Sequence, residues 1–434
     1  MKYFRHLKQL EQLTYFLLLV LLPSQLGSHF WPDASLLFGF RIDYLSPTLY
    51  LTDLLILLNA IFFLTRHHKT IIPHISSAFY NIPNFFKIFL LLFLCIIILQ
   101  LFVTTRPLLT FLSLLAIIKF SYLAIYTAVA RPLSKPQFFI GLAISLSWTY
   151  LLTILQWFNH GSLQGLWYWL GERSYSLNQP GIPASRFCFN TNECLTSLRP
   201  MATFSHPNSL AGYFVVASLL TLGLFPSKLP YANFTRSFIL IGLVTILLLT
   251  ASQAAWLAAA IATISFLIPK QWYKPIVWLS MFCFILTPFI LGHLTYNTLD
   301  LTTRQLYQSA AFKLIIHHPL IGLGLNQYLP ALPTLTDYPL RLSSLQPVHH
   351  VGLLLTSYIG LPFVVFIIYI LGKYLPQCIS NSTFIPPKYA LAIYLVIFTT
   401  ASFDHYWLTL HQNQLLLALI IGLQITSEKT ASAS

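Results

Sequence analysis

Charged residues are scarce in this chain of 434 residues, of which only 8% are Asp, Glu, Lys or Arg. A soluble domain carries about 25% charged residues. A large buried core does not explain the deficit, because soluble proteins of any size keep a polar surface. With 56% hydrophobic residues and a mean hydropathy of +0.72, the chain is expected to expose most of its surface to lipid.

The alternating apolar pattern of membrane β-strands is also missing. The apolar runs extend over about 17–22 residues, as a membrane-spanning helix requires, whereas barrel strands alternate over about 10 residues. We therefore predict an all-α polytopic membrane protein with about twelve transmembrane helices, in one integral membrane domain over residues 1–434. Two long polar interruptions, of about residues 158–208 and 292–350, are predicted to be loops on one side of the membrane.

Acidic residues are scarcer than basic ones, with ten Asp and Glu against 24 Lys and Arg and a net charge of +14. Basic residues of a membrane protein concentrate in its cytoplasmic loops. With the N-terminus inside, 15 of the 24 basic residues fall in inner segments, and both long loops fall outside. We therefore expect a multi-pass protein of the cytoplasmic membrane with both termini in the cytoplasm, in contact with membrane lipid and not with nucleic acid.

Motifs of soluble enzymes are absent: the chain has no P-loop, G-x-S-x-G, H-E-x-x-H or C-x-x-C sequence. It has only five cysteines, of which Cys188 and Cys194 lie in the first outer loop. A disulfide can persist on that side of the membrane, and nearby residues do not complete four zinc ligands at the usual spacings. We expect a disulfide between Cys188 and Cys194.

Polar residues that could carry chemistry form four fragments beside the predicted helices. The first leads into a helix that Asn208 and Ser209 are expected to cap, and the third carries imidazoles suited to general-base catalysis at a membrane boundary. Each fragment has a structural alternative, namely a capped helix, a surface helix, a structural histidine or a solvated loop. The fragments are Arg199–Asn208, Arg304 with His318–Asn326, His349–His350 and Asp404–Tyr406.

The basic residues of the two sides differ in type. The inner ones are mostly lysine, whereas the outer ones are arginine except for Lys313. Arginine presents a planar set of donors that matches a phosphate group. The outer arginines therefore indicate a site for a phosphorylated lipid, or simply pairs with outer carboxylates.

Together these fragments resemble the motifs of the O-antigen ligase and polymerase superfamily, over most of the chain from residue 199 on. The family pattern R-x-x-G-T-F-x-H-P-N resembles Arg199–Asn208. The pattern R-x(13)-H-P-L-x-G-x-G resembles Arg304 followed by His318–Gly324, and H-[NSQ]-x(9)-G resembles His349–Gly360. The last of these is typical of the ligases.

The resemblance implies a GT-C-like fold and a glycosyltransferase that acts without a cofactor or metal. Such an enzyme moves a glycan from undecaprenyl pyrophosphate to a hydroxyl of a lipid or glycan acceptor on the outer face, with inversion of configuration. It implies His349 as general base, with Arg304 as a second catalytic residue. The donor pyrophosphate is expected to bind Arg199, Arg304 and Arg341, and the supporting residues are His206, Asn208, His318, Asp404 and His350.

Three positions depart from the family patterns. Ala202 and His350 replace the usual Gly and the usual Asn, Ser or Gln, and Gln253 follows Ser252 where the family commonly has Arg. The last change removes an anion contact, for which Arg199 or Arg341 is expected to compensate. The alternative functions are a polysaccharide polymerase, a flippase and a scaffold. A transporter such as a flippase would carry several ionisable groups deep in the membrane, where only Lys119 is expected here.

Overall fold

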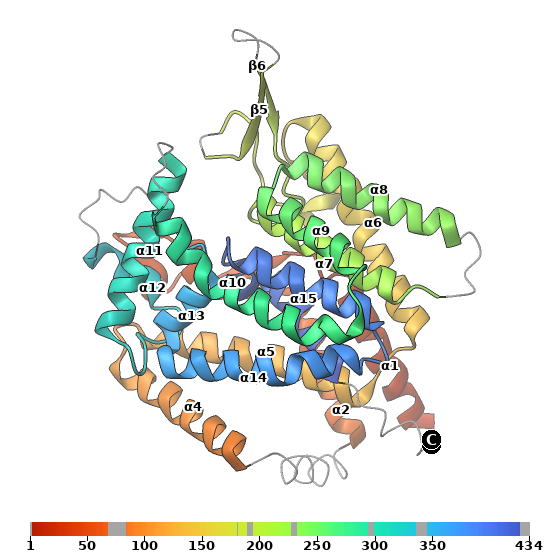
Figure 1. The fold of residues 1–434 in the computed structure, drawn as a ribbon. Helices are drawn as coiled ribbons and strands as arrows, with labels where there is room; N and C mark the ends of the chain where they lie inside the picture. The colour runs from red at the N-terminus through yellow and green to blue at the C-terminus, as the bar shows by residue number, and fades with distance from the viewer. Residues whose placement is uncertain are drawn as a thin grey trace.

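The computed structural model describes residues 2–67, 84–179, 181–188, 194–226, 232–293, 299–335 and 345–425. It is mostly helical (Figure 1), as the apolar runs predict. The helices of the first half are α1 (Lys2–Val20), α2 (Leu51–His67), α4 (Asn84–Val103), α5 (Pro107–Ala130), α6 (Lys135–Asn159) and α7 (Pro207–Gly223). Those of the second half are α8 (Ala232–Thr250), α9 (Gln253–Ser265), α10 (Tyr273–His293), α11 (Leu299–His317), α12 (Tyr328–Ala331), α13 (Val351–Ile359), α14 (Leu361–Ser380), α15 (Pro387–Ala401), α16 (Tyr406–Thr409) and α17 (His411–Ile425).

Five helices of the described chain are long and apolar enough to cross a membrane. They are α5, α6, α8, α10 with the turn before it, and α14. Helices α7, α9, α15 and part of α4 are apolar but shorter. These helices suggest a helical, multi-pass membrane protein, in agreement with the sequence.

One predicted helix is broken in two. The apolar run of residues 351–372 was expected to form a single span, but α13 ends at Ile359 and α14 begins at Leu361. Gly360 between them has φ +84°, a left-handed conformation that a helix does not contain. Pro362 lies in the first turn of α14, where a missing backbone N–H is tolerated.

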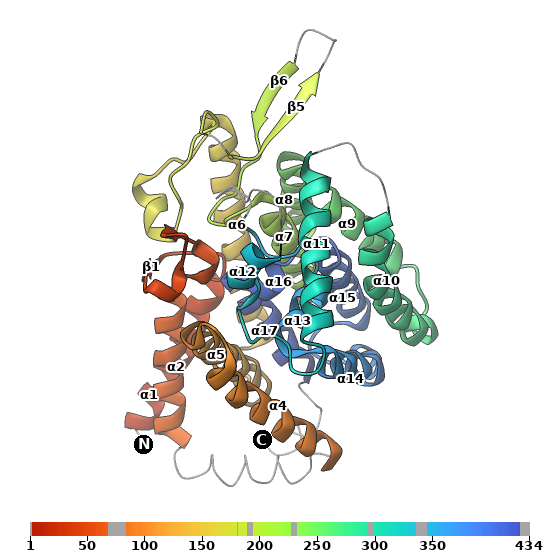
Figure 2. The same ribbon diagram turned by 90° about the vertical axis from the view of Figure 1, so that its left-hand side faces the viewer.

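Strands are short and paired in two-stranded ribbons between the helices. Three antiparallel pairs occur in the described chain: β1 (Gly27–His29) with β4 (Thr48–Tyr50), β2 (Leu36–Leu37) with β3 (Phe40–Arg41), and β5 (Ala184–Cys188) with β6 (Cys194–Leu198). The β5–β6 hairpin, in the first predicted outer loop, extends away from the helices at the end opposite the N-terminus (Figure 2). Short 3₁₀ helices complete these segments: η1 (Asp33–Ser35), η2 (Asp43–Leu45), η3 (Gly165–Leu170), η4 (Lys270–Trp272) and η5 (Leu332–Thr334).

Helix α7 lies at the centre of the larger hydrophobic core. Nearly all of its side chains are buried, against α6, α8, α9, α15 and α17. A second core joins α11 and α13 to the segment between α1 and α2 through Leu37, Leu45 and Tyr307. The starts of α7 and α13 are therefore held by packing, which fixes the side chains just before them.

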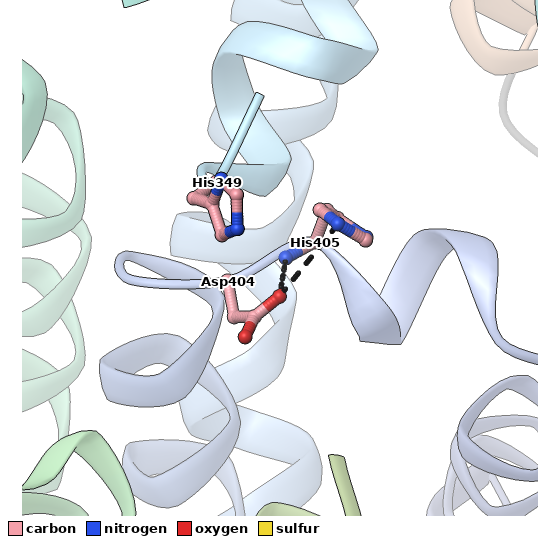
Figure 3. A group of neighbouring side chains, drawn as sticks. All are labelled: His349, Asp404 and His405. Carbon is pink, nitrogen blue, oxygen red and sulfur yellow. Dashed lines mark hydrogen bonds and ion pairs between the residues drawn. The ribbon is translucent and has the colours of Figure 1, made fainter. Parts of the chain in front are cut away.

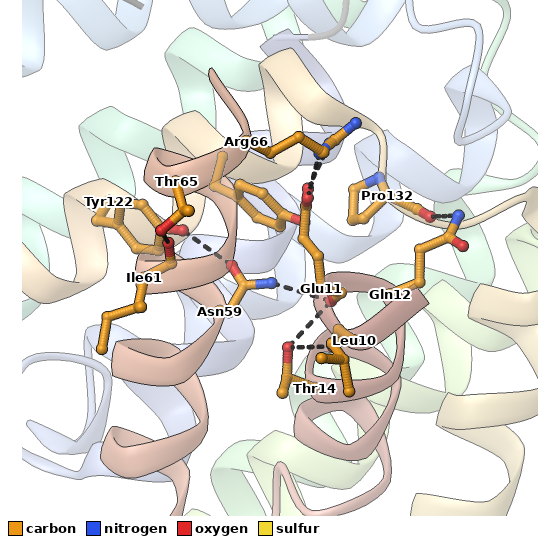
Figure 4. Close-up of polar contacts among 11 residues, drawn as sticks. Leu10, Glu11, Gln12, Thr14, Asn59, Ile61, Thr65, Arg66, Tyr122 and Pro132 are labelled. Carbon is orange, nitrogen blue, oxygen red and sulfur yellow. Dashed lines mark hydrogen bonds and ion pairs between the residues drawn. The ribbon is translucent and has the colours of Figure 1, made fainter. Parts of the chain in front are cut away.

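A polar network joins α1, α2 and α5 near the N-terminal end of the chain (Figure 4). Both carboxylate oxygens of Glu11 accept from Arg66, at 2.7 and 2.8 Å, and Tyr126 donates to Glu11 at 2.8 Å. The amide of Asn59 donates to the Glu11 carbonyl at 3.1 Å and accepts from Tyr122 at 2.8 Å. A bidentate pair with one buried partner is stronger and more directional than a surface pair.

Replacing Glu11 should destabilise this end of the bundle. Glu11→Gln keeps the side-chain shape but leaves the Arg66 guanidinium without its charged partner, so the free energy of unfolding should fall by about 1–3 kcal/mol. Thermal unfolding in detergent measures the effect. Asp43→Asn, which breaks the exposed Arg173–Asp43 pair, is the control and should change stability by at most about 1 kcal/mol. Equal losses of stability in the two variants would contradict the inference that the Glu11–Arg66 pair stabilises this end of the bundle.

Candidate functional site

Four segments that are far apart in the sequence meet in one cluster of charged and imidazole side chains. They are the residues before α7, helix α11, the residues before α13, and the turn between α15 and α16. His349, Asp404 and His405 form the centre of the cluster (Figure 3).

His349, Asp404 and His405 each place one nitrogen or oxygen within 4.8 Å of the others. The backbone N–H of His405 donates to Asp404 Oδ1 at 2.8 Å, and His405 Nε2 lies 3.9 Å from the same oxygen. His405 Nδ1 lies 2.7 Å from the Thr409 hydroxyl, and its ring centre is 5.3 Å from that of His349. The turn between α15 and α16 thus brings one carboxylate against two imidazoles.

Arg199 and Asn208 connect this centre to α7 and α8. Arg199 donates through Nη2 to Asn208 Oδ1 at 2.9 Å and through Nε to the Thr250 carbonyl at 2.6 Å. Asn208 in turn donates to Asp404 Oδ2 at 3.4 Å. One arginine therefore bridges the C-terminal end of α8, the first turn of α7 and the buried carboxylate.

The cap of α7 differs from the expected one. His206, rather than Asn208 or Ser209, precedes the helix and accepts the Asn208 backbone N–H at its Nδ1, at 3.2 Å. Ser209 donates its hydroxyl to the His206 carbonyl at 2.7 Å. Because His206 caps the helix, the Asn208 side chain is left to join Arg199 and Asp404.

Arg304 reaches the cluster from α11. It donates through Nη1 to the carbonyl of Phe403 at 3.3 Å, next to Asp404 in the chain. The structure therefore brings together Arg199, Arg304 and His349, the three residues on which the predicted site depends.

Burial and charge set the protonation of the cluster in opposite directions. Burial lowers the pKa of His349 to about 3; Asp404 opposes this shift, whereas Arg304 adds to it. Burial likewise lowers the pKa of His206 to about 4. Burial alone would raise the pKa of Asp404, but His405, His349, His206 and Arg304 together hold it below its usual value. At neutral pH the cluster therefore holds a carboxylate among neutral imidazoles.

One ring nitrogen of His349, Nδ1, is available to a bound molecule. Its ring lies nearly parallel to that of Tyr307, at 6.0 Å between centroids and 19° between planes. Nδ1 is buried and makes no hydrogen bond within the described chain. A buried polar atom without a partner is destabilising, and a neutral imidazole with an unengaged nitrogen is suited to exchange a proton with a bound molecule.

His350 has a structural role. Its Nδ1 accepts from the Leu353 backbone N–H at 3.1 Å, which caps α13, and its Nε2 lies 2.9 Å from the Phe284 carbonyl. The ring stacks on Phe284 at 4.6 Å. Both nitrogens are engaged away from Asp404, so the second histidine of the pair fixes the helix that begins beside His349.

Of three other predictions, one lies outside the cluster and two rest on atoms outside the described residues. His318 is exposed just after the end of α11, about 20 Å along the helix from Arg304. Arg341 lies outside the described residues. Cys188 and Cys194 face each other in the register of the β5–β6 hairpin, but their side chains, and so the predicted disulfide, also lie outside the described part.

The H-P-L-x-G-x-G sequence packs against the break between α13 and α14. The Leu323 N–H donates to the Ser357 carbonyl at 2.8 Å, and a side chain at Gly322 (φ +67°) would meet the Tyr358 carbonyl at 2.5 Å. A side chain at Gly360 would collide with the Leu320 carbonyl oxygen. The H-P-L-x-G-x-G sequence and the glycine that ends the His349–Gly360 motif thus meet in one backbone contact. This contact positions α13 and with it His349.

Gln100 of α4 completes this contact, and the sequence offered only a lone amide in an apolar run to indicate it. Its Nε2 donates to the carbonyls of Ile321 at 2.6 Å and Tyr358 at 2.9 Å. The amide thereby joins α4 to the loop after α11 and to the C-terminal end of α13 through one carbonyl of each.

Gly360→Ala should destabilise the protein more than an alanine at an unobstructed glycine. Gly360 has φ +84° and ψ 161°, a region that glycine alone adopts readily, and a residue with a side chain pays about 1–3 kcal/mol there. Gly39 has φ +80° with nothing within 4 Å of the added atom, so Gly39→Ala shows the cost of a positive φ without a collision. At Gly360 the overlap with Leu320 adds to it, and thermal unfolding should show a larger loss. Equal losses would show that the contact is unimportant.

Acid should destabilise the fold through the buried histidines. Unfolded histidine takes up a proton near about pH 6.5, whereas the folded pKa is about 4 for His206 and about 3 for His349. Between these values the unfolded state binds more protons, so stability falls as the pH falls. At pH 5 the contribution of each of these two histidines to the free energy of unfolding should be about 2 kcal/mol lower than at pH 7. Unfolding curves at both pH values measure this, and His206→Gln should reduce the difference; an unchanged difference would contradict the prediction.

Tyr44, from the segment between α1 and α2, is a site residue that the sequence did not indicate. Its ring lies edge-on to His405 at 5.4 Å between centroids. Asn326 donates to the Tyr44 carbonyl at 3.2 Å, which ties this segment to the loop after α11. The segment between α1 and α2 thus forms a further wall of the cluster.

The side chains of the cluster include possible ligands for a metal ion and possible donors to an anion. Two imidazoles and a carboxylate are ligands that zinc accepts. Asp404 is already hydrogen-bonded to the His405 N–H and to Asn208, and Arg304 lowers the pKa values of the groups around it. The positive charge of Arg199 and Arg304 therefore favours an anionic ligand.

Comparison with known proteins gives no assignment. No protein-family model matches the chain, and no curated protein matches it.

Proposed function

We propose that the protein is a glycosyltransferase of the O-antigen ligase type in the cytoplasmic membrane. It transfers a glycan from an undecaprenyl-pyrophosphate donor to an acceptor hydroxyl on the outer face. The observation that carries the proposal is the meeting of Arg199, Arg304 and His349 around Asp404. Arg199, Arg304 and His349 each belong to one of the three motifs that resemble the family.

The proposed chemistry is a single displacement. Arg199 and Arg304 bind the pyrophosphate and stabilise the charge that develops on it as its bond to the anomeric carbon breaks. The acceptor oxygen attacks that carbon from the opposite side, which inverts its configuration. His349 takes the hydroxyl proton at Nδ1, the nitrogen that makes no hydrogen bond within the described part of the chain. No metal or cofactor is required by these steps.

The donor itself would adjust the base. With an empty site, the pKa of about 3 makes His349 a weak proton acceptor. A bound pyrophosphate adds negative charge and offsets Arg304, one cause of the lowering, so the pKa of His349 rises towards the range in which a general base works best.

The position of Arg199 supports the idea that it compensates for the departure at Gln253. Gln253 begins α9 and is exposed. Arg199 donates to the Thr250 carbonyl, three residues before the position where the family commonly has arginine. We infer that Arg199 supplies the guanidinium that Gln253 does not.

The proposed topology keeps twelve crossings, with α13 and α14 forming one interrupted crossing and α11 lying outside the count. Both termini are then cytoplasmic. The crossings are α1, α2, α4, α5, α6, α7, α8, α9, α10, α13–α14, α15 and α17.

A transporter remains the second candidate because of one buried ionic group. Lys119 lies 2.7 Å from Asp53 and 3.4 Å from His411, between α2, α5 and α17. Ionisable groups inside a membrane bundle commonly mark transport paths. Here, however, each of these groups has a partner, whereas His349 Nδ1 in the cluster has no hydrogen-bond partner among the described residues.

Reconstitution distinguishes the candidates. Purified protein in vesicles is given an undecaprenyl-pyrophosphate glycan and candidate acceptors, with and without a chelator. A ligase forms an acceptor–glycan bond in both conditions, a polymerase extends the glycan on its donor, and a transporter moves the donor between leaflets without forming a bond. No new glycosidic bond with any acceptor would refute the proposal.

A further inference from the structure

The ribbon of β2 and β3, between α1 and α2, has an unusual turn. Leu37 pairs with Phe40, so the turn consists of Phe38 and Gly39, with φ +52° and +80°. Two-residue turns with positive φ at both positions favour Asn-Gly or Asp-Gly. A bulky aromatic residue with positive φ is an outlier, and such strain accompanies functional positions.

The strain at Phe38 is not offset by packing. The side chain is 71% exposed, and Phe40 on the other side of the turn is 55% exposed. Leu37, by contrast, is buried in the second hydrophobic core. The ribbon therefore anchors one apolar side chain in the protein and presents two large ones at its tip to the surroundings.

The ribbon is fixed beside helices that are suited to face lipid. Arg106, in the turn between α4 and α5, donates through Nη1 to the carbonyls of Ala34 and Leu36, both at 2.7 Å. Phe102 and Val103, the last residues of α4, are strongly exposed, and α5 is long and apolar enough to cross the membrane. The exposed phenylalanines thus adjoin the apolar ends of two helices.

A positive charge accompanies the apolar tip. Arg41 follows Phe40, is exposed, and places its guanidinium 5.4 Å from the ring centre of Trp31. Apolar side chains beside Trp and Arg are typical of surfaces that enter the boundary of a membrane with anionic headgroups.

We propose that the β2–β3 ribbon is a membrane-inserting hairpin. Phe38 and Phe40 enter the leaflet beside the ends of α4 and α5, and Arg41 binds lipid phosphate. A lipid surface fits better than a protein partner, because the ribbon continues the apolar surface of helices that face lipid. The inference is independent of the proposed enzyme activity.

The insertion has a consequence for the cluster of His349, Asp404 and His405. Tyr44 lies six residues after Phe38 in the same segment and contacts His405. Lipid would therefore hold one end of the segment whose other end forms a wall of the site.

The test uses the full chain with Cys95, Cys283 and Cys378 changed to Ser. Phe38→Cys is labelled with the fluorophore NBD in vesicles of phosphatidylcholine and phosphatidylglycerol, with nitroxide-bearing lipids as quenchers. The matched control is Asn178→Cys, at an exposed position near the base of the β5–β6 hairpin. The parent chain without either new cysteine, labelled in the same way, gives the background to subtract.

We expect NBD at position 38 to emit at shorter wavelength than at position 178 and to lose most of its emission to nitroxide lipid. Phe40→Cys should give the same result, and adding Phe38→Asn to it should reduce the quenching without lowering thermal stability, because Asn suits the turn. Emission typical of water at positions 38 and 40 would overturn the proposal. So would a shift to shorter wavelength without quenching, which would indicate a protein partner or a second copy of the chain.

Discussion

His349→Gln is expected to lower the rate of glycan transfer by roughly 10²–10⁴-fold, the usual contribution of a general base. Glutamine keeps polarity and approximate size beside Tyr307 but does not accept the proton of the acceptor hydroxyl. The rate of acceptor–glycan formation in reconstituted vesicles measures the effect. Thermal unfolding of the same preparation shows whether the variant is folded.

Two other histidines of the resembling motifs supply controls for this substitution. His318→Gln, at the exposed end of α11, should leave the rate unchanged although the resembling motif contains this residue. His350→Gln removes the cap of α13 and should lower stability more than the rate of the folded fraction. A folded His349→Gln variant with the wild-type rate would rule out His349 as the base.

Arg304→Ala should weaken donor binding and lower kcat/KM by roughly 10²–10³-fold, as removal of one group that stabilises a developing anion does. Arg304→Lys keeps the charge but loses the bidentate geometry, so its loss should be smaller. Titration with undecaprenyl pyrophosphate measures donor affinity separately from catalysis. If both variants bind the donor like the wild type, Arg304 does not contact the pyrophosphate.

The order of effects at Arg304 also separates two roles. Arg304 donates to the Phe403 carbonyl, so part of its effect could come from positioning Asp404. A positioning role predicts that Lys and Ala variants lose stability alike and keep donor affinity. A role in binding predicts that the Lys variant, which keeps the positive charge, binds the donor more tightly than the Ala variant does.

The helices could be predicted from the sequence because lipid-facing segments need uninterrupted apolar runs. The apolar run of residues 137–157, for example, predicts one such span, and α6 (Lys135–Asn159) begins and ends within two residues of it. The run at residues 351–372 misled for a physical reason. Hydropathy records the side chains, whereas the break at Gly360 depends on a backbone contact with Leu320 from another loop.

The candidate site could be predicted only in part. Arg199, Arg304 and His349 were indicated by chemistry and by resembling motifs, Asp404 was indicated by its chemistry alone, and the four do meet. Tyr44 carried no signal, because its place beside His405 follows from how the α1–α2 segment packs. His318 is exposed at the end of α11, away from the cluster, whereas the glycines after it contact the break between α13 and α14.

The low pKa of His349 has a consequence for the sequence of events in the proposed reaction. A buried imidazole whose pKa is lowered to about 3 is a weak acceptor for the proton of an alcohol that arrives alone. Only after the anionic substrate has entered would the ring become a competent acceptor. The protein would then favour one order of addition, the lipid-linked sugar first and the nucleophile second, because the charge of the donor offsets that of Arg304 beside His349.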